Sequence, residues 1–97
     1  MSDQKVTVLA VFKAKPGGAE KLYAVLSAMA DEARNDPGCL LFKCKRSRDH
    51  ADLFLFHEEW NSQADVENHL KMPYLTKYRE QRAPYLEGDP EVSAWLS

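Results

Sequence analysis

The sequence predicts an α+β fold in which one antiparallel sheet carries helices on a single face. Two-residue alternation of apolar side chains indicates strands, and a spacing of three and four residues indicates helices. Turn residues separate these elements in the order strand, helix, strand, strand, helix, strand. The 97 residues are enough for one core and contain neither a repeat nor a linker, so we expect a single domain over residues 1–97.

The first strand is predicted over residues 5–14, where β-branched and aromatic side chains run up to the turn at residues 15–18. An amphipathic helix follows, and Pro37 and Gly38 stop it. Its apolar residues recur at helical spacing and predict the face that packs on the sheet. They are Ala19, Leu22, Tyr23, Leu26, Met29, Ala30 and Ala33.

The second half of the chain begins with two strands, residues 39–46 and 52–60, which flank a polar turn and predict a β-hairpin. Ser62 and Asp65 have the spacing of a capping box, so a helix is expected to begin there. Pro73 interrupts this helix, a further helical piece runs to Arg82, and a short strand over residues 92–96 closes the chain. This order is the split βαβ arrangement of the ferredoxin-like fold, βαββαβ.

Both faces of the predicted sheet are apolar. On the third strand, Phe54 and Phe56 lie on one face while Leu53 and Leu55 lie on the other. The helices of this fold cover one face only, and an uncovered apolar face of this extent is rare in a monomer. We therefore expect a homodimer in which two sheets pack face to face.

Composition and charge narrow the range of partners. The net charge of −2 gives no general attraction to nucleic acid or anionic lipid, and the basic residues of the hairpin are offset by aspartates. No apolar run approaches the roughly 18 residues that span a bilayer, and no secretory leader is recognisable, so the cytoplasm is the expected location.

Cys39 and Cys44 are five residues apart in one strand, which predicts opposite faces, two free thiols and no zinc site.

Two residues near the second helix are candidates for chemistry. His69 follows Val66 by three residues and is expected on the sheet-facing side, where it is either an acid–base group or a core histidine bonded to the backbone. Trp60 ends the third strand on the same face as Phe54 and Phe56. It is either a flat pocket wall with one N–H donor or a large core residue, and the two roles are compatible.

Two further pairs of polar residues have either a role in a site or a purely structural role. Tyr74 and Tyr78 are four residues apart, so both can line one side of a cavity or pack in the core. His57 and Glu59 share the face opposite Trp60, where a structural polar contact is the favoured interpretation.

The order of these motifs resembles the antibiotic biosynthesis monooxygenase family. Its pattern is an apolar strand that ends in E-E-W, a polar cap and then H-L-x-x-P, here Glu58-Glu59-Trp60, Asn61-Ser62 and His69-Leu70-Lys71-Met72-Pro73. The turns at residues 15–17 and 37–39 also fit, and the likeness covers residues 5–96. It implies a dimeric α+β barrel with a pocket between sheet and helices. Family members include quinol oxygenases that use oxygen without metal or flavin, haem-degrading enzymes and enzymes that process a signalling sugar phosphate.

Two differences from that family refine the expectation. The haem-degrading members use an asparagine on the first strand, and residues 5–14 contain none, which argues against haem cleavage. Members close to the quinol oxygenases often have histidine directly after the proline, where this chain has Tyr74.

The leading hypothesis is a cofactor-independent monooxygenase that oxidises a small aromatic, such as a hydroquinone or polyphenol, with molecular oxygen. His69 would accept or hold the proton, Trp60, Phe54 and Phe56 would form the walls, and Tyr74 or Tyr78 would position a substrate oxygen. Two alternatives stay open. One is an oxygen-independent isomerase of a small polar metabolite, and the other is a non-catalytic dimeric module that binds a small ligand.

Overall fold

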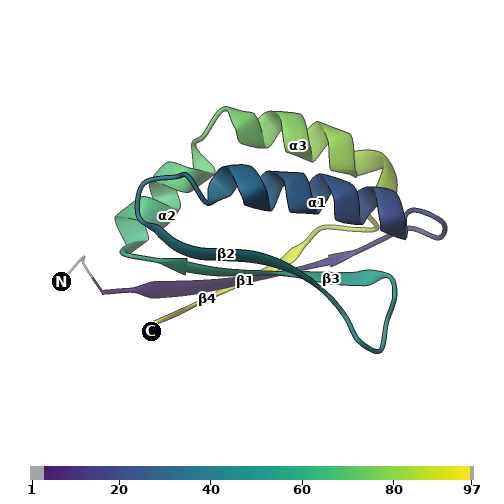
Figure 1. Ribbon diagram of the computed structural model, residues 1–97, viewed down its shortest axis with the longest axis horizontal. Coiled ribbons are helices and arrows are strands. Elements are labelled where there is room, and N and C mark those ends of the chain that lie inside the picture. The colour runs from purple at the N-terminus through teal and green to yellow at the C-terminus, as the bar shows by residue number, and fades with distance from the viewer. Residues whose placement is uncertain (1–3, 97) are drawn as a thin grey trace.

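A computed structural model describes residues 4–96 as one antiparallel sheet with all helices on one face (Figure 1). The strands lie in the order β2-β3-β1-β4, which confirms the predicted ferredoxin-like topology. The elements in chain order are β1 (Val6–Lys13), α1 (Ala19–Ala33), β2 (Cys39–Arg46), β3 (Leu53–Trp60), α2 (Gln63–Leu70), α3 (Tyr74–Arg82), a short 3-10 turn η1 (Ala83–Tyr85) and β4 (Glu91–Leu96). None of the described helices is long and apolar enough to cross a membrane.

The two central strands alternate strictly between a buried and a half-open face. In β3, which pairs with both β1 and β2, Phe54, Phe56, Glu58 and Trp60 are buried and the residues between them are half-buried. In β1 the residues at positions 6, 8, 10 and 12 are buried in the same way. The buried face is the one beneath the helices, so the alternation expected from the sequence is confirmed.

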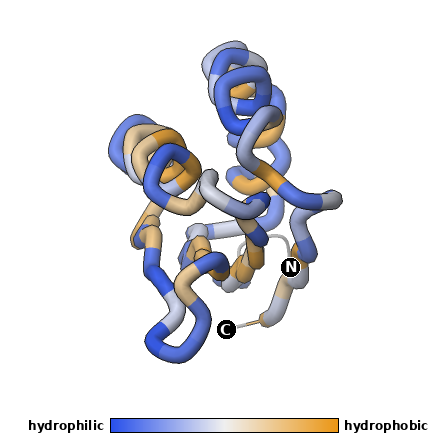
Figure 2. Tube along the Cα trace, turned by 90° about the vertical axis from the view of Figure 1, so that its right-hand side faces the viewer, coloured by the Kyte–Doolittle hydropathy of each residue, from blue (hydrophilic) through white to orange (hydrophobic). Residues whose placement is uncertain are grey.

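The helices supply the other half of the core. In α1 the buried residues are Leu22, Leu26, Met29, Ala30 and Ala33, in agreement with the amphipathic pattern. Of the other two residues predicted for this face, Ala19 is half-buried, and Tyr23 is 37% exposed with its ring stacked on that of Phe54 at 5.5 Å. Figure 2 shows hydrophilic and hydrophobic residues alternating along the two helical columns, as expected for helices that cover one face of a sheet.

A β-bulge corrects the expected placement of the cysteines. The register of β2 against β3 shifts at Leu40, so that Cys39 lies opposite Trp60 and Cys44 lies opposite Phe56. Since Trp60 and Phe56 both point to the helices, the two cysteines also share that face, and the prediction of opposite faces was wrong. One extra residue in a strand inverts the alternation beyond it. Both thiols are free, and burial raises the pKa of each.

The turn between α1 and β2 is built around Gly38, which has a φ of +81°. Its carbonyl accepts a hydrogen bond from the Asn61 N–H at 2.9 Å, and the turn therefore joins the start of β2 to the start of α2. A Cβ at position 38 would overlap the Asp65 carboxyl group, which contacts the helix-capping Ser62 hydroxyl at 3.0 Å. Both the backbone angle and the space thus require glycine here.

We expect Gly38→Ala to lower the free energy of unfolding by roughly 2–4 kcal/mol, because it adds a steric clash to the strain of a positive φ. Gly88→Ala is the matched control, since Gly88 also has a positive φ but its Cβ would meet open space. The control should cost only about 1 kcal/mol. Urea unfolding measures both, and equal costs would show that the Asp65 overlap is relieved without loss of stability.

Candidate functional site

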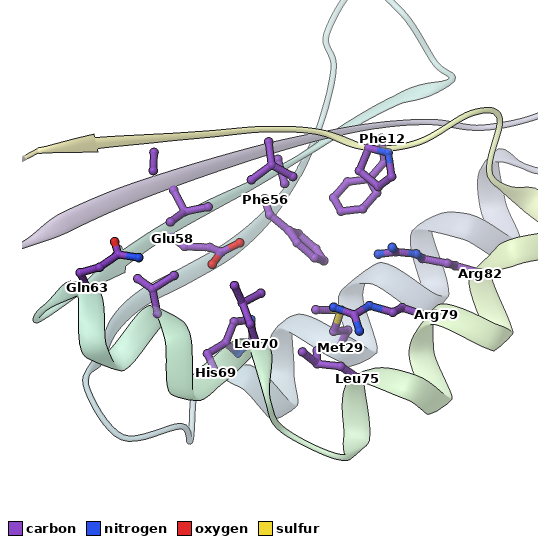
Figure 3. A pocket seen from close by; sticks show the side chains of 16 residues that line it. Phe12, Met29, Phe56, Glu58, Gln63, His69, Leu70, Leu75, Arg79 and Arg82 are labelled. Atoms are coloured by element: carbon purple, nitrogen blue, oxygen red, sulfur yellow. The ribbon is translucent and has the colours of Figure 1, made fainter.

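A cavity of about 310 Å³ lies between the buried face of the sheet and the helices α2 and α3 (Figure 3). Pro73 separates these two helices, and two small side chains of the sheet, Ala10 and Ala94, line the cavity. The cavity walls are mostly apolar and include Phe12 and Phe56. Such a volume is at the small end of ligand sites, and its few polar groups determine its chemistry. They are Glu58, Gln63, His69, Arg79 and Arg82.

Glu58 places a carboxyl group on the apolar side of the sheet. The residue is only 5% exposed, and its Oε1 accepts a hydrogen bond from the Trp60 indole N–H at 2.9 Å. Burial raises the pKa of Glu58 to about 7, since the charged form loses its hydration, while the indole bond acts in the opposite direction. A carboxyl with this pKa is suited to proton transfer near neutral pH.

His69 lies on α2 and is 4% exposed. Its Nδ1 is 2.7 Å from Oδ2 of Asp36, a buried carboxylate in the turn after α1. A carboxylate at this distance requires a proton on Nδ1, so the neutral imidazole carries its free lone pair on Nε2. No hydrogen bond within residues 4–96 occupies Nε2. The Asp36 contact therefore fixes both the orientation and the tautomer of a histidine that lines the cavity.

Trp60 lies behind the cavity and joins its two acid–base groups. The side chain is fully buried, and its ring centroid is 4.8 Å from that of His69 at an interplanar angle of 33°. The same ring donates its N–H to Glu58. Trp60 is thus not itself among the cavity-lining residues, but it holds the positions of two residues that are.

Of the other residues that the sequence suggested for the site, only Phe56 lies at the cavity. Phe56 lines the cavity, whereas Phe54 lies beneath Tyr23, away from it. The Tyr74 hydroxyl donates to Asp36 Oδ2 at 2.5 Å, and burial and then this bond raise its pKa. Tyr74 thus helps to hold the Asp36 carboxylate that orients His69.

Tyr78 points to α1, where its hydroxyl donates to Glu32 Oε1 at 2.8 Å. This hydrogen bond is the main cause of the raised pKa of Tyr78. The two tyrosines therefore hydrogen-bond to carboxylates of different segments, and neither lines the cavity.

Four functional residues were missed at the sequence level. The burial of Glu58 could have been predicted from the sequence, because it alternates with Phe56 and Trp60 on the buried face of the third strand. Arg79 and Arg82 are three residues apart on α3 and share its cavity side, a spacing that is visible in the sequence. Asp36 carried no such signal, since it is 33 residues from its partner.

On the opposite face of the sheet, His57 and Glu59 form the polar contact that was expected. His57 Nε2 lies 2.8 Å from Glu59 Oε2, and the Thr7 hydroxyl donates to Glu59 Oε1 at 2.8 Å. Within residues 4–96 no group of three or more histidine, cysteine or acidic side chains is arranged to hold a metal ion.

The comparison with known protein families decides the relationship. A family model described as antibiotic biosynthesis monooxygenase matches residues 5–81. The chain belongs to this family. The resemblance that the strand ending and the H-L-x-x-P motif indicated is thereby confirmed.

Individual members of the antibiotic biosynthesis monooxygenase family are distant in sequence but close in fold. Rv0793 of Mycobacterium tuberculosis, provisionally named a monooxygenase, is 33% identical over 76 residues, which are 78% of this chain and 74% of the relative. Its solved structure has a TM-score of 0.86, with 26% identity, and the match covers 96% of this chain and 94% of that one.

Two further relatives complete the comparison. The crystal structure of PA3566 from Pseudomonas aeruginosa has a TM-score of 0.89 at 24% identity, covers 100% of this chain and 97% of that one, and supports the fold alone. An uncharacterised protein of Synechocystis is 24% identical over 94 residues, which are 97% of this chain. The chain spans 64% of the length of that relative.

The raised pKa of Glu58 predicts a pH-dependent loss of stability. Below pH 4.5, its ordinary pKa, the carboxyl is protonated in both the folded and the unfolded chain. Between pH 4.5 and about 7 only the unfolded chain releases this proton, so the free energy of unfolding falls as pH rises, and the loss is complete above about 7. At about 1.4 kcal/mol for each pKa unit, the loss is roughly 3 kcal/mol.

Glu58→Gln should remove this loss, which urea unfolding at pH 5 and pH 8 measures. Glu80→Gln, a change at an exposed residue of α3, is the matched control and should keep the wild-type dependence. A Glu58→Gln variant whose stability follows the wild type across both pH values would contradict the assignment.

Proposed function

We propose that this chain is a monooxygenase that oxidises a small aromatic substrate, of the hydroquinone or polyphenol class, with molecular oxygen. One observation carries the proposal. An apolar cavity of about 310 Å³ is lined by Glu58, whose pKa is raised to about 7, and by His69, whose orientation is fixed by Asp36. Its apolar walls suit an aromatic ring, and its two acid–base groups suit a phenolic proton. Membership of the antibiotic biosynthesis monooxygenase family supports the same reaction class.

The chemistry begins with loss of a proton from the substrate. Glu58, as carboxylate, accepts the phenolic proton and leaves an electron-rich phenolate in a cavity of low polarity. The phenolate transfers one electron to oxygen, and the resulting radical pair combines to a peroxide anion on the ring, which takes back the proton from Glu58 to give a hydroperoxide. Loss of water then leaves one oxygen atom on the product, so that a hydroquinone and one O₂ give a hydroxyquinone and one H₂O.

His69 is the second acid–base group of this proposal. With Nδ1 held by Asp36, its Nε2 can accept a hydrogen bond from a second phenolic hydroxyl or take up a proton. The nearby Asp36 carboxylate stabilises the imidazolium that such a transfer creates. Asp36, Trp60 and Tyr74 are positioning residues in this scheme, because they act through His69 and Glu58.

We also propose that the enzyme is a homodimer through the face of the sheet that the helices leave open. Leu53 and Leu55 are only half-buried there, Val11 is 38% exposed and Trp95 is 58% exposed. A second copy would cover this apolar face by the two-fold contact that is commonest among oligomers.

Sedimentation equilibrium at micromolar concentration should give twice the chain mass of 11.1 kDa. Leu55→Asp should shift the protein to monomer, because it places a charge in the apolar contact. Thr76→Asp, at an exposed position of α3, is the control and should stay dimeric. A wild-type protein that sediments as a stable monomer would contradict the dimer.

Oxygen consumption tests the reaction itself. With metal-stripped protein and a panel of reduced quinones and polyphenols, we expect uptake well above autoxidation for at least one compound. Glu58→Gln and His69→Ala should each lower kcat by about 10²–10⁴-fold, the usual contribution of an acid–base group. Glu80→Gln should retain wild-type activity.

Uptake equal to autoxidation across the panel would overturn the proposal. Turnover of a substrate without oxygen would instead favour an isomerase that uses the same cavity. Full activity in His69→Ala would remove the histidine from the mechanism and leave Glu58 as the base.

A further inference from the structure

The cavity carries two positive charges that the proposed chemistry does not use. Arg79 and Arg82 project from the same side of α3 into the cavity, as Figure 3 shows. Neither guanidinium is within ion-pair distance of a carboxylate in residues 4–96, although other basic residues of the chain, such as Arg46, have acidic partners. The described residues therefore leave both groups without a counter-ion.

The two guanidinium groups differ in their surroundings: Arg79 is exposed, whereas Arg82 is partly withdrawn from water. Its guanidinium lies 5.3 Å from the centre of the Phe12 ring, and the residue is half-buried. Burial, and secondarily the charge of Arg79, lower the pKa of Arg82. The aromatic contact accounts for the packing of the side chain, and no acceptor within residues 4–96 is hydrogen-bonded to its N–H groups.

The charges in the cavity are also arranged along its length. In Figure 3, Glu58 reaches in from β3 at the end of the cavity that carries Gln63, whereas Arg82 reaches in from α3 at the end that carries Phe12. Phe56 lines the same cavity. A ligand with an anionic group at one end and a neutral hydroxyl at the other would therefore be aligned by charge, because Glu58 repels an anion and the arginines attract it.

We propose that Arg79 and Arg82 bind the oxyanion of an aromatic acid, whose ring fills the cavity and whose opposite end faces Glu58 and His69. The inference deepens the proposed function, on which it rests, by naming the substrate class: a phenol that also carries a carboxylate or phosphate group. The planar guanidinium fork matches both oxyanions with two parallel N–H···O bonds. The net charge of −2 gives the whole protein no attraction for anions, so this selectivity is local to the arginine pair.

Calorimetric titration with three probes of equal ring size tests the inference: 2-naphthoate, 2-naphthyl phosphate and the uncharged 2-naphthamide. The wild-type protein should bind at least one anion about tenfold or more tightly than the amide, as expected for charge-assisted hydrogen bonds. The preferred anion identifies the oxyanion class. Added salt should weaken the binding of the anion and leave that of the amide unchanged.

Variants localise the effect to the pair. In the double variant Arg79→Gln with Arg82→Gln, the affinity for the anion should fall to that for the amide. The affinity for the amide should be unchanged, which shows that the cavity is intact. Arg82→Lys should keep part of the preference, because the charge remains and the fork is lost. Arg48→Gln, in the exposed turn of the hairpin, is the matched control and should behave as the wild type.

Equal affinity of the wild type for anion and amide, no binding of any probe, or a preference that survives the double variant would overturn the inference. Its failure is distinguishable from failure of the proposed function. Oxygen uptake with neutral hydroquinones would stand without the anion preference, and the anion preference would stand without oxygen uptake.

Discussion

The site depends on the register of β3. Because this strand is hydrogen-bonded on both sides, to β1 and to β2, its alternation is fixed, and Glu58 is placed on the same face as Phe56 and Trp60. Between two large aromatic residues the carboxyl is only 5% exposed, so it remains protonated to an unusually high pH unless a donor compensates. The Trp60 indole provides only one such bond. The carboxyl that the sheet forces inward is one of the two groups that we propose for acid–base chemistry in the cavity.

The histidine is positioned by the opposite means, through contacts that are far apart in the chain. Gly38 allows the sharp turn after α1, and the turn places Asp36 beside α2, where it meets His69 and Tyr74. Pro73 separates α2 from α3, and residues of both helices line the cavity together with residues of the sheet. Packing thus forms the cavity walls, and the Asp36 carboxylate fixes the orientation of His69.

The alternation of Phe54, Phe56 and Trp60 and the helical spacing in α1 were enough to predict the fold, because both patterns are local and the chain has few ways to bury them. Within the site, the same logic predicts that Glu58 is buried, but not how much its pKa rises, which depends on the helices that cover it. The Asp36 contact joins residues 33 apart and leaves no periodic signal. The bulge at Leu40, which moves Cys39 to the inner face, is likewise set by pairing with β3 rather than by the sequence of β2 alone.

The proposed function requires Glu58 to titrate near neutral pH on the buried, mostly apolar wall of the cavity. The most direct measurement is the pH dependence of its side-chain carboxyl carbon chemical shift by NMR, assigned by comparison with Glu58→Gln. A midpoint near 7 is predicted by the burial and the single indole bond. A midpoint near the ordinary 4.5 would show that water or another donor solvates the carboxylate. That result would contradict the proposal that Glu58 is a base whose pKa burial raises.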